Sequence, residues 1–178
     1  MDGPQLTPSR RLRLRRPSTA DLQDVFSIHG DPRTNLQNPA GPDRDVGQSS
    51  RRLDGWIADW ASRGIGYWVV ELAAGPSELP VVVGFSGVRH ADWLGRPVLN
   101  LYYRFSADHW GHGYAKEAAT YAVNWAQRNL PDRPVLAYTT LDNTASQKTA
   151  LAAGLERRPE LEYELNGLHA VVFTSALS

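Results

Sequence analysis

Hydrophobic and polar residues follow two different periods along this chain, and together they predict a mixed α/β protein. Alternating or short continuous apolar runs predict strands, whereas apolar residues at steps of three and four predict helices with one apolar side. The predicted strands cover residues 11–15, 67–72, 80–88, 98–105, 135–139, 161–165 and 168–177. The four predicted helices are one capped by Ser18 or Thr19, one ended by Gly64, one over 114–129, and one between Asp142 or Asn143 and Gly154.

The clearest local feature is a strand, a glycine turn and a helix in direct succession over residues 101–119. Residues 101–105 form an apolar and aromatic run, Gly111 and Gly113 bracket one residue, and alanines recur at helical spacing after Tyr114. A helix that begins at such a turn directs several unpaired N–H groups and the positive end of its dipole toward one point. That point suits a phosphate or pyrophosphate, because glycine has no side chain to hold an anion away from the backbone.

Other phosphate-binding motifs fit this turn less well. Gly-His-Gly-Tyr-Ala-Lys lacks the third glycine of the dinucleotide-binding motif, and no acidic residue ends a strand about 20 residues later. The spacing to Lys116, with no Ser or Thr after it, does not match a P-loop. Glycines that only shape a connection remain the alternative to an anion site.

The segment Trp110-Gly-His-Gly-Tyr-Ala-Lys-Glu-Ala118 resembles the acetyl-coenzyme A motif of the GNAT acyltransferase superfamily. It is most similar to the subgroup of ribosomal-protein N-terminal (Rim-type) acetyltransferases, which show W-G-x-G-Y-A-x-E-A after a strand. Downstream, Asn143-Thr-Ala-Ser146 with the later Gly154-Leu155 resembles that subgroup's N-x-x-S…G-[FL] helix. Both motifs occur in the family's order and separation, and the resemblance covers about residues 10–177.

This resemblance implies a single-domain GNAT-like fold over residues 11–178 after a flexible leader at residues 1–10. The fold would have a central mixed, mostly antiparallel sheet of six or seven strands flanked by about four helices. Residues 30–47 contain repeated glycines and prolines and predict a long loop. The resemblance places this loop, with the first two helices, beside the groove for the acceptor substrate.

The resemblance also implies which residues bind acetyl-coenzyme A. The amides of residues 111–115 would hold the pyrophosphate, and the strand around Tyr103 and Phe105 would supply backbone partners for the pantetheine arm. Asn143 would orient that arm, and Lys148 is a candidate for a cofactor phosphate, with ordinary surface charge as its alternative. The expected cofactor-binding residues are Tyr103, Phe105, Trp110, Gly111, His112, Gly113, Tyr114, Ala115, Asn143 and Lys148.

The implied reaction moves an acetyl group to a primary amine, either a protein N-terminus or a small-molecule amine. The chain has no cysteine to carry that group, so we expect direct transfer within a ternary complex. The expected catalytic residues are Asn143, Ser146 and Tyr102, with Tyr102 or Tyr138 as an acid for the leaving thiolate. A lysine amine, neutral to only roughly 0.04% at pH 7, would need a base more than an α-amine would.

The general base is not evident. The subgroup often has a glutamate on the strand over 98–105, and Asn100, which cannot accept a proton, stands in the matching place. The remaining candidates are Glu71, His90, Asp92 or ordered water. This departure keeps a second function open, a non-catalytic module that binds or senses acyl-coenzyme A.

Composition narrows the possible partners. The chain is 42% apolar and 21% charged, with no membrane-length apolar run, and we expect a cytoplasmic protein that does not bind membranes. Basic and acidic residues balance at 19 each, which disfavours nucleic acid, although the arginines of residues 10–16 form a basic stripe. We expect no metal, since thiols and paired histidines are lacking, and exposed strand edges would allow a homodimer.

Overall fold

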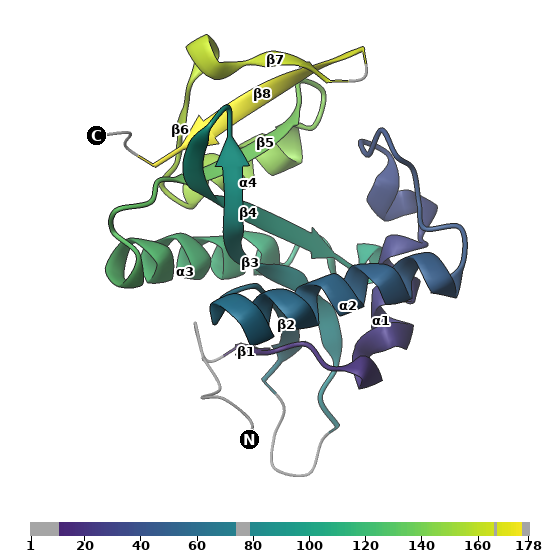
Figure 1. Ribbon diagram of the computed structural model, residues 1–178. Helices are drawn as coiled ribbons and strands as arrows, with labels where there is room; N and C mark the ends of the chain where they lie inside the picture. The colour runs from purple at the N-terminus through teal and green to yellow at the C-terminus, as the bar shows by residue number, and fades with distance from the viewer. Residues whose placement is uncertain (1–10, 74–78, 166, 176–178) are drawn as a thin grey trace.

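An open sheet of eight strands forms the centre of the molecule, with helices on both faces (Figure 1). The computed structural model describes residues 11–73, 79–165 and 167–175. The strands are β1 (Leu12–Arg15), β2 (Tyr67–Leu72), β3 (Val82–Trp93), β4 (Arg96–Phe105), β5 (Val135–Thr140), β6 (Glu156–Arg157), β7 (Tyr163–Leu165) and β8 (Leu168–Thr174). The α-helices are α1 (Leu22–His29), α2 (Val46–Arg63), α3 (Tyr114–Asn129) and α4 (Thr144–Ala152). Four 3-10 helices are described, η1 (Thr19–Asp21), η2 (Pro32–Asn35), η3 (Ala107–His109) and η4 (Pro159–Leu161).

The predicted α/β fold and its four α-helices are confirmed, and the number of strands is one higher than predicted. The additional strand is β6, which has two residues and pairs with β8. Two residues are too few to leave a periodic pattern in the sequence. β3 also extends to Trp93 rather than ending at Val88, because Leu94 and Gly95, both with positive φ, form a tight hairpin turn to β4.

The sheet is antiparallel except at one junction. Its strand order is β1-β2-β3-β4-β5-β8-β6, with β7 paired to β8 outside this path. β4 and β5 run parallel and pair at only two positions, Leu99 with Val135 and Asn100 with Leu136. Beyond these positions the two strands diverge, and the sheet opens between them.

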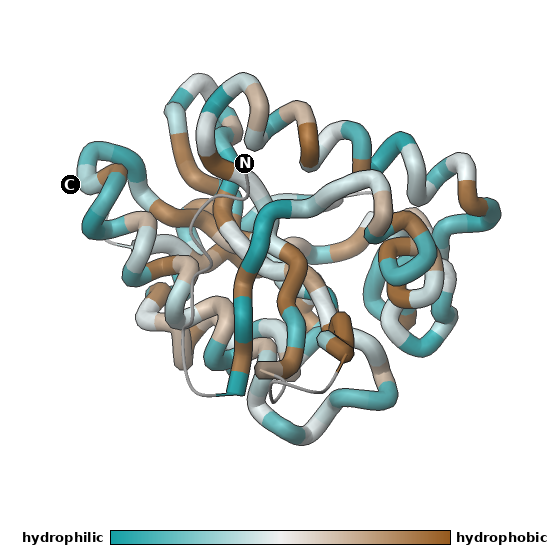
Figure 2. The backbone as a smooth tube through the Cα atoms, turned by 90° about the horizontal axis from the view of Figure 1, so that it is seen from below, coloured by the Kyte–Doolittle hydropathy of each residue, from teal (hydrophilic) through white to brown (hydrophobic). Residues whose placement is uncertain are grey.

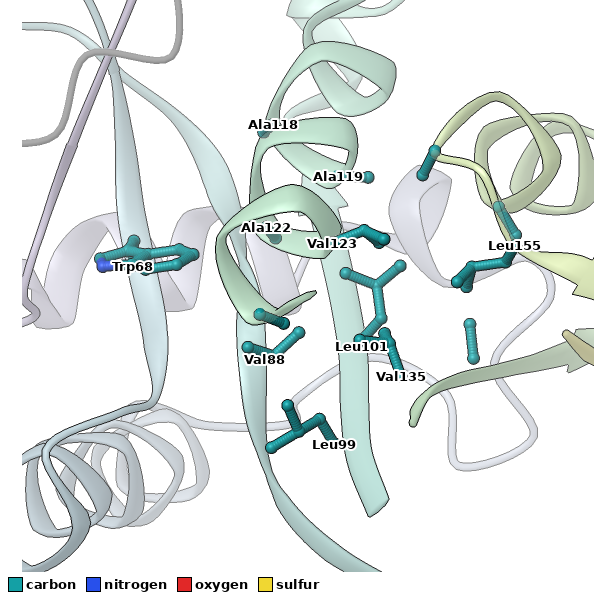
Figure 3. Close-up of a cluster of buried hydrophobic side chains, with 14 of the residues drawn as sticks. Trp68, Val88, Leu99, Leu101, Ala118, Ala119, Ala122, Val123, Val135 and Leu155 are labelled. Atoms are coloured by element: carbon teal, nitrogen blue, oxygen red, sulfur yellow. The ribbon is translucent and has the colours of Figure 1, made fainter. Parts of the chain in front are cut away.

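The two faces of the sheet pack against different helices. In β2, Trp68 and Val70 belong to the cluster that contains the buried side of α3, while Tyr67 and Val69 pack with α1 and α2. This alternation follows from the two-residue repeat of a strand. Figure 3 shows part of the larger cluster, in which alanines allow α3 to approach β3 and β4 closely. Figure 2 shows apolar segments along the central strands and alternating apolar and polar segments along the outer helices.

Some sequence predictions fall outside the described residues: the leader at residues 1–10, the turn with Gly75 and Pro76, and Asn166 of the predicted Asn-Gly hairpin. The hairpin itself is present, because β7 and β8 pair antiparallel around Gly167, whose φ is +78°. Among the helices of the described chain, none combines the length and the apolar character needed to cross a membrane.

Candidate functional site

A cleft of about 890 Å³ opens where β4 and β5 diverge. It is lined by both strands, the glycine turn and first residues of α3, the N-terminal half of α4, and the loop between α1 and α2. Thr140 Oγ1 and Gln37 Oε1 approach to 3.3 Å and connect β5 to that loop. The cleft therefore joins the predicted phosphate-binding turn to the predicted acceptor loop.

On one side of the cleft, β4 presents an unpaired backbone edge. The N–H of Leu99 donates to the carbonyl of the residue preceding β5, at 2.9 Å. Because backbone groups alternate sides along an antiparallel strand, the other odd-numbered residues of β4 also direct their N–H and C=O away from β3. Leu101, Tyr103 and Phe105 are in this position, although Trp110 Nε1 donates to the carbonyl of Phe105 at 3.0 Å. The two strand residues expected to bind the cofactor thus lie on the open edge.

The glycine turn leaves the N-terminus of α3 without a side-chain cap. Gly111 and Gly113 have φ values of +82° and +79°, in the left-handed region that favours glycine. Gly113 is the N-cap residue, and no side chain in the described part of the chain caps the helix there. A Cβ at either glycine would have no atom within 4 Å, so the space outside the turn is open. Several backbone N–H groups can therefore reach an anion in the cleft.

Two expected cofactor-binding residues do not line the cleft with their side chains. The ring of His112 stacks on Tyr114 with centroids 5.4 Å apart, and its Nδ1 lies 3.0 Å from the Trp110 carbonyl. Lys148 is exposed on α4, whereas Ser146 of the same helix lines the cleft. The position of Lys148 gives no support to a role with a cofactor phosphate.

The first turn of α4 is connected to β4 across the cleft. Asn143 caps the helix, since its Oδ1 accepts from the N–H of Ser146 at 3.1 Å, and its Nδ2 has no hydrogen-bond partner among the described residues. The Tyr103 hydroxyl lies 2.8 Å from the Ser146 carbonyl and 2.9 Å from its Oγ. Burial raises the pKa of Tyr103 to about 12, so the phenol stays protonated and donates to that carbonyl. Ser146 and Tyr103 therefore hold the two sides of the cleft together.

Tyr102 lies on the opposite face of β4, against α1. His29 Nδ1 is 3.0 Å from the Val25 carbonyl and must carry the proton to bond with it, so Nε2 accepts from the Tyr102 hydroxyl at 2.7 Å. Burial, together with the positive charges of Arg104 and Arg52, lowers the pKa of His29 to about 3. Burial also raises the pKa of Tyr102. Both groups are neutral near pH 7, and the hydroxyl proton of Tyr102 is directed at His29.

None of the candidate bases from the sequence lines the cleft. Glu71 is buried between two arginines of β1, which excludes it as a base for the cleft. His90 belongs to the α3 side of β3, and burial lowers its pKa. Asp92 accepts from the N–H of Gly95 at 2.8 Å and lines a small neighbouring pocket of about 220 Å³. Asn100 lines both cavities, and its Nδ2 donates to the Tyr67 hydroxyl at 2.7 Å.

The sequence analysis missed His29 and Arg104. Arg104 lines the cleft on the same face of β4 as Asn100 and Tyr102, and strand alternation alone could have placed these three side chains together. No local pattern marks His29, because its contact with Tyr102 joins residues 73 positions apart. Within residues 11–73, 79–165 and 167–175, no group of three metal-ligating side chains is positioned to hold an ion.

Comparison with known proteins agrees with this geometry. A family model described as the acetyltransferase (GNAT) domain matches residues 11–156. The acetyltransferase from Agrobacterium tumefaciens str. C58 is similar in structure, with a TM-score of 0.79 and 24% sequence identity over 99% of this chain and 96% of that chain.

Two other solved structures similar to this chain contain coenzyme A. Spermidine N-acetyltransferase from Vibrio cholerae, in complex with coenzyme A and spermine, has a TM-score of 0.70 and 15% identity, with 93% of this chain and 94% of that chain covered. RimL, a ribosomal L7/L12 alpha-N-protein acetyltransferase in complex with coenzyme A, has a TM-score of 0.70 and 15% identity, covering 97% of each chain. At these levels of sequence identity, the structural similarity shows a shared fold and nothing more.

Proposed function

The chain belongs to the GNAT acetyltransferases, whose cosubstrate is acetyl-coenzyme A, and we propose that it transfers the acetyl group to a primary amine. One observation carries the proposal. The open backbone edge of β4 and the uncapped N-terminus of α3 line the same cleft. An extended amide chain ending in a pyrophosphate matches those two features in turn.

In the proposed complex, the amides of residues 111–115 bind the pyrophosphate. The backbone groups of Leu101 and Tyr103 pair with the amides of the pantetheine arm, as a neighbouring strand would. Asn143 Nδ2 supplies a further donor from α4, because Oδ1 of the same side chain is used for the helix cap. Bound coenzyme A supplies the acetyl thioester, and these residues hold it with the sulfur near the point where the strands diverge.

The acceptor amine approaches from the face of β4 that carries Asn100 and Tyr102. The Tyr102 hydroxyl donates to His29 and accepts a side-chain hydrogen bond from Arg104, so one lone pair on its oxygen remains to accept an N–H of the amine. The neutral nitrogen attacks the thioester carbonyl carbon, the C–S bond breaks, and coenzyme A leaves as a thiolate. The nitrogen loses one proton to water, and positioning supplies most of the rate.

The shortage of carboxylates in the cleft favours an amine of low pKa as the acceptor; His109, beside the glycine turn, is the one imidazole among the described residues that line the cleft. The only carboxylate that lines the cleft, among the described residues, is the exposed Asp142. An α-amine with a pKa of about 7.7–8.0 is neutral to roughly 10–17% at pH 7, without assistance from the enzyme. We therefore favour an α-amine over a lysine side chain.

Isothermal titration with acetyl-coenzyme A tests the cofactor site. Gly111→Glu places bulk and negative charge where the pyrophosphate is expected, and we expect micromolar binding by the wild type to weaken at least about 100-fold. Gly95→Glu is the matched control, since Gly95 has nearly the same φ, +81°, and the same open space, but lies in the β3–β4 turn. It should bind like the wild type. If the wild type fails to bind acetyl-coenzyme A, the proposal is wrong.

A non-catalytic acyl-coenzyme A-binding module is the second candidate, and the lack of a base near Asn100 favours it. The two functions differ in whether an amine accelerates release of the coenzyme A thiol. A thiol reagent measures this release without background, because the protein contains no cysteine. Amine-dependent release supports the transferase, whereas tight binding with no release for any amine supports the sensing module.

A further inference from the structure

On the acceptor side of the cleft, one arginine lacks an acidic partner. Two arginines line the cleft, Arg33 and Arg104. Arg33 forms ion pairs with Asp31 at 2.7 Å and Asp108 at 2.8 Å. Arg104 forms no ion pair with any carboxylate in the described part of the chain, and its Nη1 donates to the neutral amide oxygen of Asn35. The charge of Arg33 is thus balanced, while that of Arg104 is not.

The surrounding loop holds Arg104 in place. Asn35 is buried, and its Nδ2 donates to the carbonyls of His29 and Asp31, both at 2.8 Å. These bonds fix the amide so that Oδ1 faces Arg104, and Asn38 Nδ2 donates to the same oxygen at 2.9 Å. A guanidinium has five N–H donors; the bond to Asn35 accounts for one, and a side-chain hydrogen bond to the Tyr102 hydroxyl accounts for another. The others remain for a ligand at a charge that the fold has already positioned.

Arg104 is close to the proposed site of acetyl transfer. It lies two residues after Tyr102 on the same face of β4, which corresponds to about 7 Å along the strand. Both side chains line the cleft. An acceptor whose nitrogen contacts Tyr102 would bring a carboxylate on its first or second residue within reach of the guanidinium.

We propose that Arg104 binds a carboxylate of the acceptor, so that the substrate is an α-amino acid or a short peptide with an acidic residue next to its N-terminus. This inference depends on the proposed acetyl transfer. Carboxylate and guanidinium form short, paired hydrogen bonds that neutral amides do not match. The same charge disfavours polyamines, since the cleft offers their several ammonium groups only Asp142 among the described carboxylates.

Matched acceptor pairs test the proposal. We would measure kcat/KM from thiol release for α-amino acids against their α-amides, for Ser-Asp-amide against Ser-Asn-amide, and for spermidine. Each pair would be measured with wild type, Arg104→Gln and, as the matched control, Arg33→Gln. For each enzyme, the kcat/KM of the carboxylate member of a pair is divided by that of its neutral partner. Dividing a variant's ratio by the wild-type ratio then removes the effect of the different amine pKa values, because both enzymes act on the same two amines.

We expect the wild type to prefer the carboxylate member of at least one pair by about 10- to 100-fold, the value of a charge-assisted hydrogen bond. Arg104→Gln should reduce this preference by about 10- to 100-fold relative to the wild type, and Arg33→Gln should leave it within about threefold of the wild-type value. A preference in the amino acid pairs indicates that Arg104 binds an α-carboxylate, and a preference in the peptide pair indicates that it binds the side chain of an acidic residue.

Three results would overturn the proposal: an unchanged preference in Arg104→Gln, no turnover of any carboxylated amine, or spermidine as the best acceptor. Titration with acetyl-coenzyme A separates these results from failure of the proposed function. If the wild type binds acetyl-coenzyme A and acetylates only neutral or polycationic amines, the role of Arg104 is wrong while the transferase stands.

Discussion

The arginines of β1 and the arginine near the end of β4 belong to one sheet but have opposite surroundings. Arg13 and Arg15 share the carboxylate of Glu71, with N–O distances of 2.6 Å, and Arg15 also pairs with Asp21 at 2.5 Å. The Glu71 side chain is only 2% exposed. Arg104 is half-buried as well, yet among the described residues it bonds to the Asn35 amide and the Tyr102 hydroxyl and to no carboxylate.

This difference shows why a row of arginines in a sequence is a poor guide to a binding site. The arginine stripe near the N-terminus suggested an anionic partner, but Arg11 pairs with Glu117 at 2.5 Å and Arg16 lies over the ring of Trp60 at 4.7 Å. Two of the carboxylates that balance these arginines, Glu71 and Glu117, come from distant segments of the chain, whereas Asp21 lies six residues after Arg15. A buried charge that the fold balances contributes to folding, whereas one left without an opposite charge is available for a ligand.

The largest expected effect comes from removing the carboxylate at the β1 end. Glu71→Gln leaves two partly buried arginines without their shared anion, and we expect the free energy of unfolding to fall by about 3 kcal/mol. Urea denaturation followed by circular dichroism measures this change. Acetyl-coenzyme A affinity should not change, because Glu71 does not line the cleft.

Removing the charge of Arg104 on β4 is expected to affect stability much less than removing the charge of Glu71. Arg104→Gln should lower the free energy of unfolding by less than about 1 kcal/mol, because it removes a charge that has no opposite charge beside it. A larger loss for Arg104→Gln than for Glu71→Gln would show that Arg104 serves the fold, and the comparison between the two regions would fail.

The sequence predicted features that are encoded locally. The strand, glycine turn and helix around Gly111, and the capped helix after Asn143, were both found where they were expected. Each depends on turn chemistry and periodicity within a few residues. Because the two motifs also resemble a known family, they led to the correct fold.

The rest of the site depends on contacts between distant segments. Arg104 meets Asn35 across 69 positions of the sequence, and the Glu71 carboxylate is buried by arginines more than 50 positions away. Such contacts leave no periodic pattern, which is why Glu71 could be considered a base. Strand alternation places Arg104 on the same face as Tyr102, but it does not show which residues surround its charge. The opening between β4 and β5 likewise depends on a contact between distant segments, because the two strands pair at only two positions.

A third prediction concerns His29, a buried residue that bonds to the Tyr102 hydroxyl. Its pKa is lowered to about 3 in the folded protein, against about 6.5 when unfolded. Below pH 6.5 the unfolded chain therefore binds a proton that the folded protein does not, and stability falls as the pH falls. Between pH 6.5 and 5 this contribution is about 2 kcal/mol, at 1.36 kcal/mol per pH unit.

The variant His29→Gln isolates this effect from the other titrating groups. Urea denaturation measures the free energy of unfolding at pH 6.5 and at pH 5. The decrease between these two pH values should be about 2 kcal/mol smaller in the variant than in the wild type. Equal losses would mean that His29 gains its proton in the folded protein. The residue beside Tyr102 would then be able to act as a base in the reaction.

The last prediction concerns Asn143, which serves the fold and the proposed site with different atoms. Asn143→Ala removes the α4 cap and should lower stability by about 1 kcal/mol, or the midpoint of thermal unfolding by about 2–4 °C. Asn143→Asp keeps an oxygen for the cap but loses the Nδ2 donor, so it should unfold like the wild type and bind acetyl-coenzyme A about tenfold more weakly. Calorimetry and titration measure the two properties separately. If Asn143→Asp binds acetyl-coenzyme A as the wild type does, the side chain is a helix cap only. Asn143 would then serve the fold, as the paired arginines of β1 do, rather than a ligand, as proposed for Arg104.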